Sequence, residues 1–279
     1  MKLSWLQSAI LGFVSGLSEP LPLSPEAHRA ILGKFFGGGE LNPLILFACH
    51  LAPMVVVLLT GSLELKRLRR TRKILKTPPR RRTGHPELNS AGTLKLLRTA
   101  VPIVLVARLL RVYLSGIGNK LYLLTLTLTL CGLILHIPTH MRTANKDGRH
   151  LIGFDGMLMA AGIGLGSLPG VSAVGAAVSL GTIRGADRRY ALRFAWILLC
   201  IALAVSLGLD VLAILGTGLE FDLELILCAL LAGAAAAAGS WLAVRMMLAL
   251  VRRGGNGISG FSYYNWGLAL LCLALFLLV

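Results

Sequence analysis

The chain has 279 residues, of which 56% are hydrophobic and 14% are charged. Soluble domains usually carry about 25% charged residues, so this composition excludes a soluble globular protein and indicates an integral membrane protein. The net charge of +16 could suggest nucleic-acid binding, but that function needs cations spread over a water-exposed face with aromatic residues nearby. Here the cations lie between apolar runs, so we expect no nucleic-acid partner. The five cysteines lie singly in apolar segments, which disfavours a disulfide framework.

The apolar runs predict eight membrane-embedded segments. A helix needs about 20 apolar residues to cross the hydrocarbon layer of a bilayer. Six stretches meet this condition, near residues 43–62, 94–114, 121–139, 194–214, 223–250 and 261–279. Two more apolar regions, 3–36 and 154–183, are interrupted by prolines and glycines. Proline removes a main-chain donor and clashes with the preceding turn, so we expect each of these regions to form a re-entrant helical hairpin.

The distribution of Lys and Arg predicts the orientation. Twelve of these residues lie between positions 66 and 98, and short loops rich in Lys and Arg stay on the cytoplasmic side. The loop 63–93, which contains Arg80, Arg81 and Arg82, is therefore placed inside, with the basic segments 142–149, 184–193 and 245–253. The acidic turn at 220–224 and the N-terminus then fall outside.

This orientation gives the two halves of the chain the same plan. Residues 1–140 and residues 150–279 each read as a hairpin followed by three spans, inserted from opposite sides. The predicted fold class is therefore an all-α integral membrane protein, with six transmembrane helices and two re-entrant helical hairpins arranged as an inverted-topology repeat. In such folds the broken helices bind polar substrate groups near the membrane midplane.

The first hairpin places Glu19, Ser24, Glu26 and His28 within apolar sequence. An ionisable side chain inside a membrane segment costs at least about 2 kcal/mol and normally faces a cavity or a partner. Glu19 is therefore the strongest candidate for a functional residue. The alternative is that Glu26, His28 and Arg29 lie in water at the outer rim and only Glu19 lies deep.

The second hairpin contains a glycine-rich turn, with Pro169, Gly170, Ser172 and Gly175 near its end. A turn of this kind that opens a helix presents free amides that suit phosphate oxygens. Close packing of helices also uses small residues, so both interpretations stay open.

These motifs resemble those of the integral-membrane undecaprenyl-diphosphate phosphatases, which remove one phosphate from a C55 isoprenoid diphosphate so that the cell-wall lipid carrier is reused. The resemblance covers Ala9–Gly33, Phe47–Leu59, Pro169–Leu198 and Ser262–Leu270. It implies a polyprenyl (undecaprenyl) phosphate or diphosphate lipid as partner, and a multi-pass location in the bacterial inner (plasma) membrane. A homo-oligomer is compatible with it.

The resemblance also implies roles for single residues. Glu19, Ser24 and His28 would be catalytic. The phosphate would be bound by Pro169, Gly170, Ser172 and Gly175, and the cofactor would be a divalent cation, Mg²⁺ or Ca²⁺, with Glu19 as a ligand. Two residues outside the family pattern could compensate for groups that this chain lacks: Arg29, beside His28, could reach the phosphate, and Glu26 could join Glu19 as a metal ligand. His50 is expected to be a hydrogen-bonded packing residue.

The chain departs from the family pattern at several positions. Members usually carry glutamate, serine, glycine, an arginine-serine pair and arginine where this chain has Ser15, Pro25, Ala27, Ala173-Val174 and Asn265. An arginine on the transferred phosphate can contribute about 10³ to 10⁵ in rate, and Ala173 contributes no charge. Two functions therefore stay open. One is a diphosphatase with altered or impaired hydrolysis, and the other is a non-hydrolytic undecaprenyl-phosphate binding protein or flippase.

Overall fold

The computed structural model describes residues 3–78, 85–114, 120–141, 145–218, 222–252 and 258–278. The Arg80-Arg81-Arg82 run, Arg142, Glu220 and Arg253, which entered the topology prediction, lie outside these ranges. The described part is built from helices joined by turns, with an isolated β-bridge between Lys146 and Ala186. The all-α prediction is therefore confirmed for these residues.

The first half of the chain forms seven α-helices and two 3₁₀ turns in the described residues. They are α1 (Trp5–Ser18), α2 (Pro25–Phe35), α3 (Pro43–Thr60), α4 (Ser62–Leu75), η2 (Pro86–Ser90), α5 (Ala91–Leu109), α6 (Arg111–Leu114), α7 (Leu121–His136) and η4 (Ile137–His140). The second half forms α8 (Gly153–Leu165), α9 (Ala173–Ile183), α10 (Arg188–Gly216), α11 (Leu223–Arg252) and α12 (Gly260–Leu278).

Polar side chains define where several of these helices begin. Ser4 and Gln7 form a capping box at the start of α1, and Asp187 caps α10. Ser24 caps α2, which has Pro25 in its first position, and Ser172 caps α9. These side chains satisfy amides that have no partner within the helix, so α2 and α9 start directly after their interruptions.

Within the described residues, five helices are long and apolar enough to cross a membrane. They are α3, α7 with η4, α10, α11 and α12. Helix α5 covers most of the predicted span 94–114 but carries Lys95, Arg98 and Arg108, which lower its apolar character. The chain is thus a multi-pass helical membrane protein.

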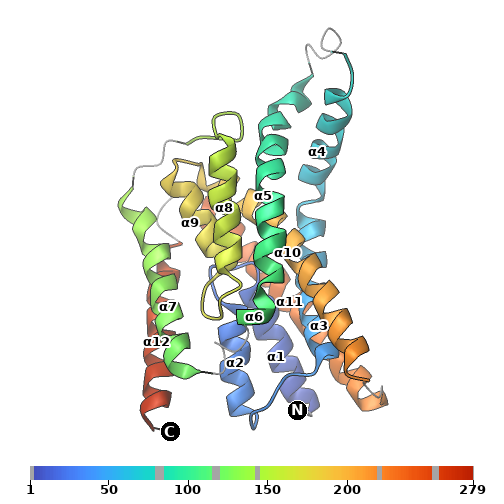
Figure 1. Ribbon diagram of the computed structural model, residues 1–279, viewed down its shortest axis with the longest axis vertical. Coiled ribbons are helices and arrows are strands. Elements are labelled where there is room, and N and C mark those ends of the chain that lie inside the picture. The colour runs from blue at the N-terminus through green and yellow to red at the C-terminus, as the bar shows by residue number, and fades with distance from the viewer. Residues whose placement is uncertain are drawn as a thin grey trace.

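The segment 63–93, predicted as a basic loop between two spans, contains helix α4 and the 3₁₀ turn η2. Helix α4 continues beyond α3 for fourteen residues, with Glu64 in its first turn and Arg72 and Lys73 in its last. Leu, Lys and Arg are good helix formers, and these charges complement the helix dipole. In Figure 1, α4 projects from the end of the molecule opposite to both termini.

Each interrupted region folds back on itself, and the two do so from opposite ends (Figure 1). Leu3, before α1, shares an apolar cluster with Phe36, which follows α2. At the other end, Arg184 after α9 pairs with Asp155 at the start of α8, with 2.6 Å between Nε and Oδ1. Both pairs of short helices therefore return to the end where they begin.

Each helix pair packs against a long helix from the other half of the chain. Helix α1 lies along α11, and α8 lies along α5. At Gly12 and Gly16, a Cβ atom would overlap the main chain of Ala232 and Ala236. Ser240 on α11 also donates a 2.8 Å hydrogen bond to the Gly16 carbonyl. The α1 and α11 backbones thus touch because these positions lack side chains.

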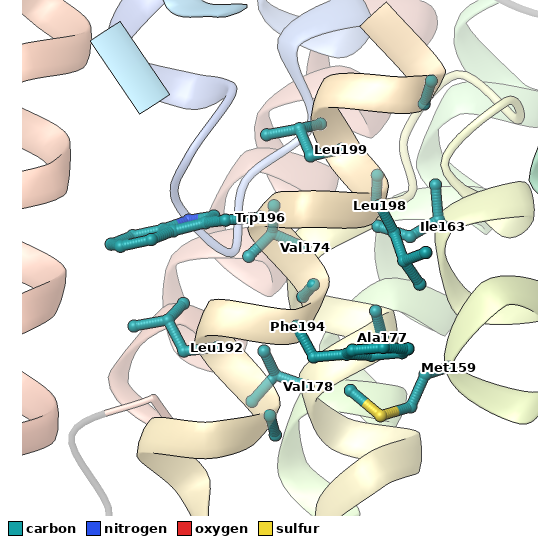
Figure 2. Close-up of a cluster of buried hydrophobic side chains, with 14 of the residues drawn as sticks. Met159, Ile163, Val174, Ala177, Val178, Leu192, Phe194, Trp196, Leu198 and Leu199 are labelled. Carbon is teal, nitrogen blue, oxygen red and sulfur yellow. The ribbon is translucent and has the colours of Figure 1, made fainter. Parts of the chain in front are cut away.

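The main core surrounds α9, in which nine of the eleven residues are buried. Figure 2 shows Val174, Ala177 and Val178 of α9 between side chains of α8 and α10. Phe194 of α10 is 1% exposed and lies beside Met159 of α8. A helix that is apolar all round must be covered on all sides, and this core fixes the second interruption in place.

A compact polar loop lies just before α8 and contains Asp147 and Arg149. Asp147 accepts hydrogen bonds from the Arg149 main chain and guanidinium. These bonds lower the pKa of Asp147 to about 2. The carboxylate therefore stays charged at all physiological pH values.

Candidate functional site

The two interruptions, between α1 and α2 and between α8 and α9, meet inside the molecule. A serine from each one forms a hydrogen bond with the main chain of the other. The Ser24 hydroxyl accepts hydrogen bonds from Ala27 N at 3.3 Å and from Gly170 N at 3.0 Å. Ser172 reciprocates, because its hydroxyl accepts from Gly175 N at 3.0 Å and donates to Leu21 O at 3.2 Å. Each capping serine thus bonds to the main chain of the other interruption.

The main-chain carbonyls of the first interruption receive donors from distant helices. Trp196 Nε1 of α10 donates to Pro20 O at 3.2 Å. Asn265 Nδ2 of α12 donates to Pro22 O at 3.2 Å. Non-helical backbone within a membrane must be satisfied by protein groups, and these side chains do so. Asn265, where the family usually has arginine, therefore holds the first interruption.

These contacts bring together the sequence-predicted Ser24, Gly170, Ser172 and Gly175. Their hydroxyl and amide groups bond to one another and to the main chain. Pro169 contributes its carbonyl, which accepts a 2.6 Å hydrogen bond from Thr127. Their proposed roles toward a phosphate or as a nucleophile stay predictions.

His28 makes two short hydrogen bonds and a longer one of 3.4 Å between Nδ1 and the Ser18 hydroxyl. Its Nδ1 lies 2.7 Å from the Ser24 carbonyl, which can only accept, so Nδ1 carries the proton. Its Nε2 then accepts from the Tyr264 hydroxyl at 2.7 Å. The His28 ring contacts the main-chain oxygen of Ser24 rather than its hydroxyl. Tyr264 was missed as a site residue, although the tyrosine pair opening α12 was visible in the sequence.

A mostly apolar groove of about 570 Å³ opens beside His28. It runs between α1, α2, α11 and α12, and Ser18, His28 and Tyr264 are its polar residues. Its apolar lining includes Val14, Leu17, Ile31, Met246, Leu250 and Phe261. The groove could hold an apolar chain whose polar end lies at His28.

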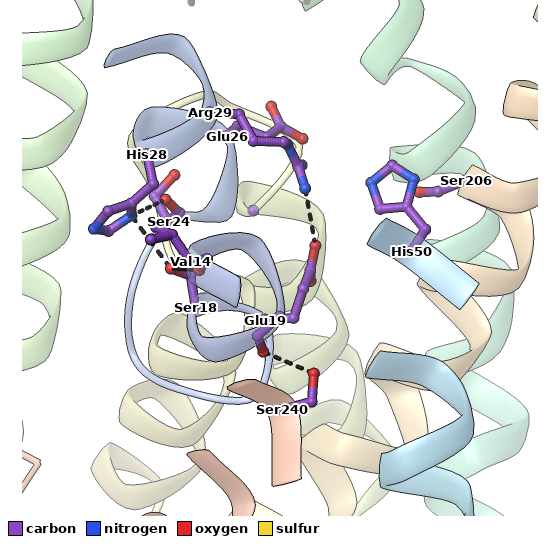
Figure 3. A network of polar contacts seen from close by, with 12 residues as sticks. Val14, Ser18, Glu19, Ser24, Glu26, His28, Arg29, His50, Ser206 and Ser240 are labelled. Atoms are coloured by element: carbon purple, nitrogen blue, oxygen red, sulfur yellow. Dashed lines mark hydrogen bonds and ion pairs between the residues drawn. The ribbon is translucent and has the colours of Figure 1, made fainter. Parts of the chain in front are cut away.

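Charged side chains gather on the other side of α2. Glu19 and Arg29 are 4% and 5% exposed, and Oε1 and Nη1 lie 3.6 Å apart (Figure 3). Glu26 Oε1 lies 2.8 Å from Arg111 Nε and 3.9 Å from Arg108 Nη1. Only 12% of the Glu26 side chain is exposed, which argues against the alternative that it lies in water at the rim.

Arg108 and Arg111 were missed from the sequence. Both fall within the predicted span 94–114, where the rule that marked Glu19 also applies to cations. Arg108 Nη1 also donates to Gly166 O at 3.2 Å, at the end of α8. Arg111 Nη1 donates to Ser206 on α10 at 3.2 Å. The two arginines therefore connect the first helix pair to the second helix pair and to α10.

His50 lies near this cluster, on the α3 side in Figure 3. Its Nδ1 lies 2.6 Å from Asp210 Oδ2 of α10, and the residue is fully buried. His50 is thus hydrogen-bonded inside the core, and Asp210 is a buried carboxylate that the sequence analysis did not single out.

The two candidate metal ligands do not fit a cation held between them. Glu19 faces Arg29, and Glu26 faces Arg111 and Arg108. Guanidinium groups repel a divalent cation, which needs six or more oxygen ligands. Among the residues described, no three His, Cys, Asp or Glu side chains cluster as metal ligands would.

The fold and the site define a multi-pass membrane protein with buried ionised groups where two interrupted helix pairs meet. The comparison with known sequences agrees with this class. Residues 8–271 match the bacitracin resistance protein BacA family, and the chain belongs to that family.

Three relatives named undecaprenyl-diphosphatase illustrate the match. The protein from Nocardioides sp. is 30% identical over 70% of each chain. The protein from Carboxydothermus hydrogenoformans is 28% identical over 96% of each chain. The protein from Rubrobacter xylanophilus is 28% identical over 99% of this chain and all of its own.

Proposed function

We propose that this protein recycles a polyprenyl lipid carrier in the bacterial plasma membrane by hydrolysing undecaprenyl diphosphate to undecaprenyl phosphate and phosphate. The observation that carries the proposal is the family match over residues 8–271, with relatives named undecaprenyl-diphosphatase over nearly full length. The site supports it, because an apolar groove and a cluster of buried charges lie on either side of α2.

The membrane architecture is an inverted repeat in this proposal. Helix α5 is the sixth span, and the pairs α1–α2 and α8–α9 are re-entrant hairpins. Helices of 11 to 14 residues are about 17 to 21 Å long and do not cross a 30 Å hydrocarbon layer. The exchanged packing of α1 on α11 and α8 on α5 supports the repeat.

The reaction needs a polar pocket that admits water and excludes the apolar isoprenoid chain. The isoprenoid lies in the groove and its diphosphate lies against α2. A water oxygen attacks the terminal phosphorus, the bond from that phosphorus to the bridging oxygen breaks, and undecaprenyl phosphate leaves. Glu19 accepts the proton of the attacking water. His28, after taking up a proton from solvent at Nε2, gives it to the bridging oxygen as undecaprenyl phosphate leaves. Water is the nucleophile here because the Ser24 hydroxyl already accepts two main-chain donors.

The test is phosphate release from undecaprenyl diphosphate by the purified protein in detergent. We expect release by the natural protein and a loss of at least about 100-fold in Glu19→Gln and in His28→Ala. Glu224→Gln, at an exposed carboxylate of α11, is the matched control and keeps full activity. A parallel assay with EDTA tests the divalent cation expected from the resemblance. Release that is equal in all variants contradicts the proposal.

A second candidate, a binding protein or flippase, is favoured by one observation. His28 bonds to the Ser24 carbonyl rather than its hydroxyl, so the two do not form a nucleophile-base pair. Inverted repeats are also common in transporters. The test is the rate at which labelled undecaprenyl phosphate crosses the bilayer of vesicles. If this rate is higher in vesicles that contain the protein than in protein-free vesicles, and no phosphate is released, this candidate replaces hydrolysis.

A further inference from the structure

Polar groups of the second interruption already form hydrogen bonds within the protein. Ser172 bonds to Gly175 N and Leu21 O, and Gly170 N bonds to Ser24. Ala173, the first residue of α9, is 8% exposed and carries no charge. An anionic head group placed there finds neither free amides at these positions nor a cation on residue 173.

Buried cations lie elsewhere, on α2 and at the end of α5. Arg29 and Arg108 are the arginines classed as buried among the described residues, at 5% and 3% exposure. Arg111 follows on α6, with 18% of its side chain exposed. Arg108 interacts electrostatically with Arg29, Arg111, Glu19 and Glu26, so the five groups share one small region.

The carboxylates in this region do not fully satisfy the arginines. Within the described residues, Arg29 Nη1 and Arg108 Nε have no hydrogen-bond partner, although both are buried. A buried donor without a partner costs about 1 to 3 kcal/mol, and more when charged. Three guanidinium groups face Glu19 and Glu26, and a third carboxylate, Asp210, bonds to His50 nearby. The region thus has free N–H groups on two buried guanidinium groups.

We infer that Arg29, Arg108 and Arg111 form the binding site for the phosphate groups of the lipid substrate. The inference rests on the proposed function and names the ligands of its head group. Guanidinium groups stay charged when buried and bind phosphate oxygens through paired N–H donors. Arg111 is the most exposed of the three and meets the head group first, while Arg29 lies deeper beside Glu19, on the side of α2 opposite to the groove. Ion pairs with Glu19 and Glu26 hold the arginines until the ligand arrives.

The test measures equilibrium binding of undecaprenyl phosphate to the purified full-length protein in detergent, with inorganic phosphate as a second probe. We expect Arg111→Gln to raise the Kd for the lipid at least 10-fold and Arg111→Lys to raise it less. Arg98→Gln, at an exposed arginine on α5, is the matched control and stays within twofold. Lipid binding at least 100-fold tighter than inorganic phosphate binding identifies a lipid head-group site. Equal affinity for both probes overturns the lipid assignment.

Two further measurements cover the case in which Arg111→Gln does not fold because Glu26 loses its 2.8 Å partner and keeps only Arg108 at 3.9 Å. The double variant Glu26→Gln/Arg111→Gln removes both charges, and we expect the same rise in Kd. In the natural protein, undecaprenyl phosphate should slow phenylglyoxal labelling of Arg111, mapped by mass spectrometry, and leave Arg98 unchanged. Unaltered affinity in the double variant, or labelling of Arg111 that the lipid does not slow, overturns the inference.

A gain-of-charge variant separates this site from the second interruption. Ala173 packs directly against Gly166, whose carbonyl accepts from Arg108. Ala173→Arg therefore adds a like charge near Arg108, and we expect no gain in phosphate release. A gain of 10-fold or more places the phosphate at α9 and contradicts the inference. Binding of lipid without any phosphate release by the natural protein removes the hydrolytic function but leaves the arginine site intact.

Discussion

The Ser24 hydroxyl serves two helices at once. It caps its own helix through Ala27 N and accepts Gly170 N from the second interruption. The sequence analysis expected only a catalytic role for Ser24, although a serine before Pro25 and Glu26 is a common N-cap pattern. No local pattern can indicate the bond with Gly170, because Gly170 lies 146 residues away.

Replacing Ser24 should therefore lower the free energy of unfolding more than the loss of an ordinary helix cap does. We expect Ser24→Ala to lower the free energy of unfolding by about 2 to 4 kcal/mol, since it removes a cap and leaves a buried amide unpaired. Unfolding in mixed micelles measures this loss. Ser4→Ala, which removes an exposed cap of α1, should cost about 1 kcal/mol. Equal losses in the two variants contradict the shared role of Ser24.

The charged residues show what single-residue analysis can and cannot find. Glu19 stood out because it interrupts apolar sequence, and it is buried with Arg29. Arg108 and Arg111 obey the same rule but lie at the end of a long apolar run, where cations commonly reach the membrane surface. Only the folded chain shows that both turn inward to Glu26.

At the level of elements, prolines and glycines predicted both interruptions well. The first interruption contains Pro20 and Pro22, and Pro25 is the first residue of α2. The second interruption, between α8 and α9, contains Pro169 and Gly170. Backbone chemistry is local, so the sequence reveals it. The neighbours of each helix are set by tertiary packing, and the contact of α1 with α11 could not be read from the spacing of apolar residues.

The glycines of α1 provide a test of that contact. We expect Gly16→Ala to lower the free energy of unfolding by about 1 to 3 kcal/mol, because the new methyl group overlaps the Ala236 carbonyl. Gly208→Ala on α10 is the control, since nothing lies within 4 Å of the added atom. Alanine favours a helix over glycine by about 1 kcal/mol, so this control should be neutral or stabilising. A neutral Gly16→Ala would show that α1 does not lie this close to α11.

On the scale of the whole molecule, charge and helix arrangement agree on an orientation. The basic helix α4 lies at one end, and both termini lie at the other (Figure 1). The positive-inside rule places α4 in the cytoplasm. The termini and the end of α10 then face outward.

Cysteine labelling in intact cells tests this orientation. Arg69→Cys on α4 and Gly216→Cys at the end of α10 are both at exposed positions. The native Cys49, Cys131, Cys228 and Cys272 are buried, and Cys200 is replaced by serine in both variants. We expect a membrane-impermeant maleimide to label position 216 in intact cells and position 69 only after permeabilisation. The reverse pattern would place the basic helix outside.

The reciprocal serine bonds also constrain biosynthesis. When the ribosome has completed the first helix pair, the Ser24 hydroxyl still lacks its donor from Gly170, and the Gly16 carbonyl still lacks Ser240, which lies 224 residues further on. We therefore expect the Ser24 hydroxyl and the Gly16 carbonyl of the nascent amino-terminal hairpin to stay without these partners until most of the polypeptide has been inserted. A ribosome-bound fragment that stops before α11 should remain sensitive to proteases and be a natural client of membrane chaperones.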